Sequence, residues 1–127
     1  MTWPDAEAAL VAWLTPRLGL RVCTDTPVAL ETALPLVRLR RIGGTDDGFR
    51  LDRALIDVDA FATDRAGAAA LAGRVRDVVL TNLPSASTRG AVFTAAATVT
   101  APCWRPWDNP AASRFGAVYA IHLHAAP

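Results

Sequence analysis

Two alternating segments on either side of a charged, glycine-containing stretch constrain the fold of this chain most strongly. Residues 36–42 (LVRLRRI) alternate apolar and arginine side chains, and residues 53–62 (RALIDVDAFA) alternate apolar and aspartate side chains. Strict alternation places one set of side chains on each face of a β-strand. The stretch between them, residues 43–52, contains three glycines and is rich in turn-forming residues. We therefore predict two antiparallel strands joined by a charged connection.

This pairing brings opposite charges together across the two strands. Asp57 and Asp59 are expected to lie across from Arg38 and Arg40. Cross-strand charge pairs of this kind contribute a few tenths to about 1 kcal/mol each. The connection over residues 43–52 is expected to stay mobile in a free subunit and to become ordered on contact with a partner.

Two amphipathic helices are predicted. The first begins with Pro4 in its first turn, with Thr2 or Trp3 as the N-cap, and closes at Gly19. The second begins after Thr63 or Asp64 and carries an apolar stripe at helical spacing. Three further strands are expected over residues 20–24, 91–101 and 116–125, and in the second of them Phe93, Ala95, Ala97 and Val99 are expected on one face.

The element order is therefore α-β-β-β-α-β-β. Consecutive strands with few crossover helices predict an α+β fold, with a mostly antiparallel (mixed) β-sheet of about five strands and two α-helices packed on one face. A single domain over residues 1–127 is expected, because 127 residues suffice for one buried core.

Composition excludes several classes of function. A formal net charge of +1, from 13 basic and 12 acidic residues, gives no bulk attraction to nucleic acid or to an anionic membrane. We expect neither a signal peptide nor a membrane span, because residues 1–19 do not follow the signal-peptide pattern and no apolar run approaches roughly 18 residues. Cys23 and Cys103 lie far apart and show no metal-binding spacing, so buried, reduced thiols are expected.

Motifs for nucleotide chemistry and acyl transfer are missing. The GGT at residues 43–45 belongs to neither phosphate-loop pattern and precedes no helix start, and no GxSxG is present. A divalent-metal site is an alternative, because Asp57-x-Asp59 and His122-x-His124 each place two metal-binding side chains on one strand face. A small metal-dependent enzyme would require those two strands to be neighbours.

The loop CWRPWDNP offers another alternative. Trp104, Arg105 and Trp107 are residue types enriched at binding hot spots. They would suit a ligand-binding module or a contact with another protein. The competing interpretation is a loop folded back over the edge of the core.

The layout as a whole resembles a known family. The opening helix PDAEAALVAWLTPRLG, the strand LRVCTDTP and the segment LPLVRLRRIGGTDDGFRLDRALIDVDAFATDRAGAAALAGRVRDVVL are followed by a final pair of strands. In this order they resemble the tail terminator (tail completion, minor tail) proteins of long-tailed phages and prophages, especially those of actinobacterial hosts. The closing loop here is longer and richer in tryptophan than that family pattern.

The resemblance implies a structural virion protein without catalytic residues, cofactor or bound metal. It implies a homo-oligomeric ring, commonly a hexamer, assembled in the host cytoplasm. The ring would cap the head-proximal end of the tail tube, stop tube polymerisation and contact the neck (connector) protein. The implied partners are the major tail tube protein and the neck, with DNA passing through the lumen without sequence-specific recognition, and no membrane.

Charged side chains around the predicted hairpin are the expected contacts between subunits or with the tube. The neutral net charge, with arginines on one strand and aspartates on the other, suits head-to-tail contacts that close a ring. The expected interface residues are Arg38, Arg40, Arg41, Asp46, Asp47, Arg50, Asp52, Arg53, Asp57 and Asp59, with Trp104, Arg105 and Trp107 as possible loop contacts.

Overall fold

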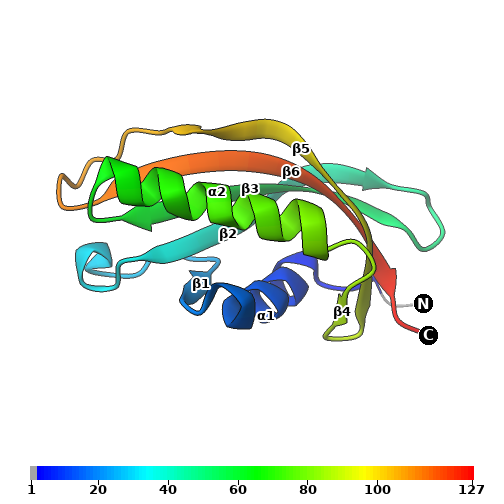
Figure 1. Ribbon diagram of the computed structural model, residues 1–127. Coiled ribbons are helices and arrows are strands. Elements are labelled where there is room, and N and C mark those ends of the chain that lie inside the picture. The colour runs from blue at the N-terminus through cyan, green and yellow to red at the C-terminus, as the bar shows by residue number, and fades with distance from the viewer. Residues whose placement is uncertain (1–2) are drawn as a thin grey trace.

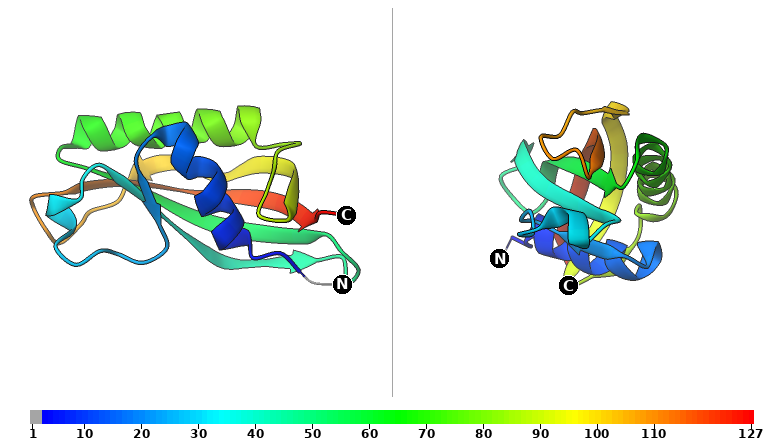
Figure 2. Two further views of the ribbon diagram at one scale, coloured as in Figure 1. Left: turned by 90° about the horizontal axis from the view of Figure 1, so that it is seen from below. Right: turned by 90° about the vertical axis from the view of Figure 1, so that its left-hand side faces the viewer.

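The protein folds as a curled six-stranded β-sheet with two α-helices on one side (Figures 1 and 2). The computed structural model describes residues 3–127. The strand order is β1-β2-β3-β6-β5-β4, in which β1 and β2 are parallel and the other neighbours antiparallel. The elements are α1 (Ala6–Leu18), β1 (Arg21–Cys23), the 3-10 turn η1 (Leu30–Thr32), β2 (Leu36–Asp46), β3 (Asp52–Ala62), α2 (Arg65–Asn82), β4 (Ser87–Thr88), β5 (Ala91–Trp104) and β6 (Ser113–Ala125).

This architecture confirms the predicted α+β class and the mixed, mostly antiparallel sheet. The sixth strand, β4, was missed because it has only two residues and pairs only with the start of β5. The β2–β3 hairpin is also longer than predicted. Residues 43–46 and Asp52, expected to be loop, belong to the paired strands, and a register shift between Arg41 and Gly43 accommodates the extra residue.

The helix ends follow local hydrogen-bonding rules. Asp5 caps α1 by accepting a hydrogen bond from the Ala8 amide at 3.0 Å, so the prediction of Trp3 as the cap is wrong. Thr2, the other predicted cap, lies outside the described residues. Gly19 ends α1 with φ 67°, a left-handed conformation that favours glycine. Asp64 caps α2 through the Gly67 amide, as predicted.

The main core lies between the helices and the sheet. Figure 2 shows α2 running along the strands, with α1 crossing beside it on the same side. The sheet contributes alternate residues of β2, β3 and β6 to this core, as the alternation of the sequence predicts. Its largest fully buried members are Leu10, Trp13, Leu14, Leu39, Ile56, Leu83, Phe93, Tyr119, Ile121 and Leu123.

Strand β5 departs from the simple alternation. Phe93 is fully buried, but Val99, expected on the same face, is 56% exposed. The register with β6 shifts between Phe93 and Ala95 and again beyond Thr98. Each bulge inserts a residue and therefore reverses which side chains point inward. The predicted apolar face of residues 93–99 is wrong for this reason.

Two loops cover the opposite face of the sheet at one end. They are residues 24–35, before β2, and residues 105–112, between β5 and β6. Together they bury a second, smaller apolar cluster of Leu30, Leu36, Phe61 and Ala112. A hydrogen bond of 3.0 Å from Asn109 Nδ2 to Glu31 Oε2 joins the two loops. We call this part of the molecule the loop end.

The exposure of the two cysteines and the character of the two helices can be compared with the predictions from the sequence. Cys23 is half-buried and its burial raises the pKa of the thiol, but Cys103 is exposed, so the prediction that both thiols are buried is wrong for Cys103. Cys103 is exposed because β5 extends past the edge that β4 covers. Within residues 3–127, neither helix combines the length and apolar character of a transmembrane span.

A buried hydroxyl provides a test of this packing. The Tyr119 side chain is 1% exposed, and its hydroxyl has no hydrogen-bond partner among the described residues. Burying an unpaired hydroxyl costs about 1–3 kcal/mol. We expect Tyr119→Phe to maintain or raise the free energy of unfolding, and Tyr119→Ala to lower it by about 3–5 kcal/mol because of the cavity. Urea denaturation checks both variants, and a clear loss of stability in Tyr119→Phe would show that the hydroxyl has a partner.

Candidate functional site: the charged β2–β3 hairpin and the arginine–aspartate cluster

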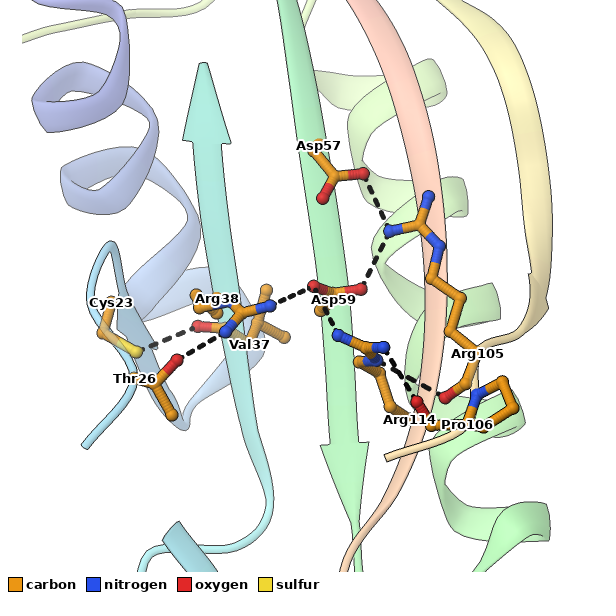
Figure 3. Close-up of polar contacts among 9 residues, drawn as sticks. All are labelled: Cys23, Thr26, Val37, Arg38, Asp57, Asp59, Arg105, Pro106 and Arg114. Atoms are coloured by element: carbon orange, nitrogen blue, oxygen red, sulfur yellow. Dashed lines mark hydrogen bonds and ion pairs between the residues drawn. The ribbon is translucent and has the colours of Figure 1, made fainter. Parts of the chain in front are cut away.

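One buried carboxylate organises the charged residues at the loop end. Asp59 is 2% exposed and lies on the sheet face away from the helices, directly opposite Arg38 on β2. Its Oδ2 accepts a hydrogen bond from Arg38 Nη2 at 2.6 Å, and its Oδ1 accepts one from Arg105 Nη1 at 2.9 Å. Arg114 Nη1 lies 3.8 Å from Oδ2. Figure 3 shows the three guanidinium groups converging on this carboxylate.

The pairing of Arg38 with Asp59 confirms the predicted cross-strand geometry. The second predicted pair differs in detail: Arg40 lies opposite Asp57 in the register, but Asp57 Oδ1 accepts a hydrogen bond from Arg105 Nη1 at 2.8 Å. Burial lowers the pKa of Arg105, but its hydrogen bond to Asp57 and the two nearby carboxylates together raise it. Arg105 therefore holds two adjacent carboxylates with one guanidinium group.

Gly116 on β6 makes room for Arg105. A Cβ placed at Gly116 would lie 2.3 Å from Arg105 Nη1 and 2.4 Å from its Cδ and Cζ. The arginine side chain thus lies flat across the glycine, between the loop and the carboxylates. No other residue type at position 116 leaves this path open without moving Arg105.

An edge-on aromatic contact, two cation–π contacts and the Thr26 hydroxyl complete the cluster. The Trp107 ring contacts Phe61 edge-on, with centroids 5.1 Å apart. The guanidinium carbons of Arg114 and Arg38 lie 4.8 and 5.7 Å from the centroid of the same ring. Arg38 also donates a hydrogen bond to the Thr26 hydroxyl. These contacts attach both covering loops to the sheet through Arg38, Arg105 and Arg114 (Figure 3).

The ten charged residues predicted at the interface divide into two groups. Arg38, Asp52 and Asp59 are buried, and their charges are paired inside the chain. Asp52 accepts two hydrogen bonds from Arg41, at 2.6 and 2.8 Å, which raise the pKa of Arg41. The remaining side chains reach the surface: Arg40, Arg41, Asp46, Asp47 and Arg50 are exposed, and Arg53 and Asp57 are half-buried.

The tip of the β2–β3 hairpin, residues 47–51, is held by its own side chains. Asp47 Oδ1 accepts hydrogen bonds from the amides of Phe49, Arg50 and Leu51, at 2.8, 2.7 and 2.9 Å. These bonds, that of Phe49 first, lower the pKa of Asp47. The Asp47 amide also donates to the Leu51 carbonyl at 3.0 Å. Figure 1 shows the hairpin extending past the end of α2, at the opposite end of the sheet from the loop end.

The predicted tryptophan platform is divided between the two faces of the sheet. Trp104 packs edge-on against Phe115, with centroids 6.0 Å apart, and Arg65 at the start of α2 lies 4.7 Å from its ring centroid. Trp107 lies on the other face, against Phe61. With Arg105 in the cluster, the three side chains present no common ligand surface.

The predicted metal site is contradicted by the strand register. Strands β3 and β6 are neighbours, and Asp57 lies opposite Val118, but His122 is four residues further along β6 and lies opposite Arg53. Four residues span about 13 Å along a strand, too far for a shared ion. Among residues 3–127, no three His, Cys, Asp or Glu side chains gather as metal ligands.

Sequence reasoning missed Thr26, Arg114 and Gly116. None belongs to a motif, and each acquires its role only from a neighbour distant in sequence. Gly116 was taken as the first residue of the last strand, whereas it lies within β6 beneath Arg105. The alternation of apolar and aspartate residues along β3 was the one sequence signal that pointed to the arginine–aspartate cluster.

Comparison with known proteins identifies the family of the chain. The family profile described as "Phage tail termination protein" matches residues 2–99. The chain belongs to the phage tail termination proteins. This membership confirms the predicted tail terminator family, whereas the actinobacterial host stays a prediction, and it places the protein in the virion tail, as a structural component. The matched part includes the whole β2–β3 hairpin and α2.

A solved structure shares the fold of this tail termination protein. One chain from "Virion of native gene transfer agent (GTA) particle" superposes with a TM-score of 0.66 at 18% identity, covering 94% of this chain and 95% of that one. At this identity the likeness shows a common fold. No curated protein matches the chain significantly.

The contact between Arg105 and Gly116 predicts a sharp difference between two glycines. Gly116→Ala should displace Arg105, leave Asp57 and Asp59 partly uncompensated, and lower the free energy of unfolding by about 2–5 kcal/mol. Gly73, within α2, has open space around its Cβ position, so Gly73→Ala should raise stability by about 0.5–1 kcal/mol. Chemical denaturation measures both. Equal, small effects would mean that Arg105 is not held against the sheet.

The hairpin tip should respond to acid in a defined direction. Because the native tip lowers the pKa of Asp47 below its ordinary 3.8, the bonded tip is favoured above that pH and is lost as pH falls through the lowered pKa. Amide exchange at residues 49–51 should therefore accelerate at low pH beyond the intrinsic trend. Asp47→Ala should have the same effect at neutral pH, whereas Asp108→Ala, at an exposed aspartate of the 105–112 loop, should have none. Exchange unaffected by Asp47→Ala would contradict this role.

Proposed function

We propose that this tail termination protein forms a homo-oligomeric ring, a hexamer, that caps the head-proximal end of the tail tube. The ring ends tube polymerisation and offers a surface to the neck of the capsid. The observation that carries the proposal is the family match over residues 2–99, which includes the charged hairpin. We further propose that residues 1–127 act as one domain and that the protein has no catalytic role and needs no cofactor.

The charges left free by the fold support a role in assembly. Arg40, Asp46, Asp47 and Arg50 are exposed on one hairpin, with both signs close together. Mixed charge on a projecting element favours partners with a complementary pattern and discourages like-charged contacts. A ring requires two different surfaces on each subunit, because its contacts are head-to-tail.

The same surfaces suit the proposed partners. The tube end and the neck would contact opposite faces of the ring, and DNA would pass through the lumen. A chain with a net charge of +1 can line a DNA passage without tight, non-specific binding. Recognition of a DNA sequence or a membrane has no part in the proposal.

Charge reversal on the hairpin tests the proposal. Arg40→Glu and Arg50→Glu should each weaken subunit association by about two- to fivefold, since exposed ion pairs contribute up to about 1 kcal/mol. Arg76→Glu, on the exposed side of α2, should leave association unchanged. Native mass spectrometry and light scattering, with and without the tail tube protein, measure the oligomers. Tube length by electron microscopy measures termination.

The proposal fails if the wild-type protein stays monomeric both alone and with tube protein and leaves tube length unchanged. A dependence on Arg76 equal to that on Arg40 would mean that the hairpin charges have no specific part in subunit association. High salt should weaken association of the wild-type protein more than that of the reversed variants.

A further inference from the structure

An apolar groove lies beside the first half of α2, near the loop end. Its volume is about 360 Å³, and its walls come from α2, from the end of β3 and from the residues that precede β1 and β2. The lining includes Leu20, Pro35, Ala62, Ala70, Leu71 and Arg74. Ala70 is exposed at its edge, so the groove opens to the surface.

Arg74 fixes one rim of this groove. Its Nη2 donates hydrogen bonds to the Leu18 carbonyl at 2.6 Å and to the Arg17 carbonyl at 3.4 Å, at the C-terminal end of α1. A guanidinium group at the last carbonyls of a helix is favourable for the helix dipole and holds the two helices at a fixed spacing. The Arg74 rim of the groove is therefore tied to the C-terminal end of α1.

An exposed aromatic side chain stands at the other end of the molecule. Phe49, in the hairpin tip, is 71% exposed, the most exposed aromatic ring among the described residues. The hydrogen bonds of Asp47 hold its backbone amide in place. A rigid tip reduces the ordering entropy lost on binding, so an exposed Phe49 is suited to insert into an apolar site.

The tip and the groove of one chain cannot meet. They lie beyond opposite ends of β3, which runs from Asp52 to Ala62. Eleven residues of strand separate them by about 35 Å. The hairpin is paired along its whole length and cannot fold back. A contact between them therefore joins two copies, head to tail, and each copy keeps one tip and one groove free for the next.

Charges beside the tip and the groove are complementary. Asp46, Asp47 and Arg50 flank Phe49. Arg74 belongs to the groove lining, and the exposed Arg21 directly follows Leu20 of that lining in sequence. The acidic side chains of the tip can therefore face an arginine at the groove rim.

We propose that Phe49 of one subunit inserts into the groove between α2 and Pro35 of the next copy of this chain. This inference deepens the proposed ring and rests on it, because it names the contact that repeats around the ring. Both surfaces are apolar at the centre and charged at the edge, as in other specific interfaces. The fixed angle between tip and groove would then set the number of subunits.

Disulfide cross-linking tests the contact directly, in a Cys103→Ser background that removes the exposed native thiol. A mixture of Phe49→Cys chains with Ala70→Cys chains should give a linked dimer under mild oxidation. Neither single variant on its own should give a linked dimer. The Phe49→Cys/Ala70→Cys double variant should give a ladder of linked oligomers. Val28→Cys, at a side chain 98% exposed, mixed with Ala70→Cys is the matched control.

The inference is overturned if the Phe49/Ala70 mixture links no more than the Val28/Ala70 control, or if Phe49→Cys links to itself. Phe49→Ala should raise the dissociation constant between subunits at least about tenfold, as for a hot-spot residue, and Val99→Ala should not change it. If rings form and resist Phe49→Ala, this contact is wrong but the ring stands. If the wild-type protein forms no oligomer with or without tube protein, both fail.

Discussion

The packing of the loop end depends on a single buried carboxylate, that of Asp59. A charge at 2% exposure requires compensation inside the protein. Arg38 supplies it from the neighbouring strand, and Arg105 and Arg114 supply it from the two sides of the 105–112 loop. The loop therefore closes onto the sheet, and any side chain at position 116 would displace Arg105 from its present place. Removal of Asp59 would leave the buried Arg38 without its carboxylate partner, which is why such clusters are costly to disrupt.

The charged residues at the two ends of the sheet have different roles. At the loop end, arginine and aspartate neutralise one another and stabilise the fold. At the hairpin end, charges of the same types remain exposed on an element whose backbone is fixed by Asp47. The proposed ring uses this division, since it needs one projecting surface and one receiving surface on every subunit. The groove beside α2 and the exposed Phe49 ring fit those two roles, with the length of β3 keeping them apart.

Much of the fold could be predicted from periodicity. The alternation of β2 and β3 gave their pairing and the Arg38–Asp59 contact, and helical spacing gave α2 with its Asp64 cap. The faces of β5 could not be predicted, because its bulges reverse the alternation without a sequence signal. Strand β4 was too short to show a period. Trp104 and Trp107 lie on opposite faces of the sheet, as an odd spacing along an extended chain implies, so the predicted common tryptophan platform overlooked the alternation.

The sequence by itself determined the fold class, the family and the charged hairpin, because these depend on local periodicity and on the order of elements along the chain. The tertiary structure alone decided which charges are free. Arg38 and Arg40 stand two residues apart on one strand and are alike in sequence, but Arg38 is buried against Asp59 while Arg40 is exposed. The difference arises from Thr26 and Trp107, which the fold brings over Arg38 from distant segments. Burial of a charge is a property of its neighbours in space, and only the folded chain supplies them.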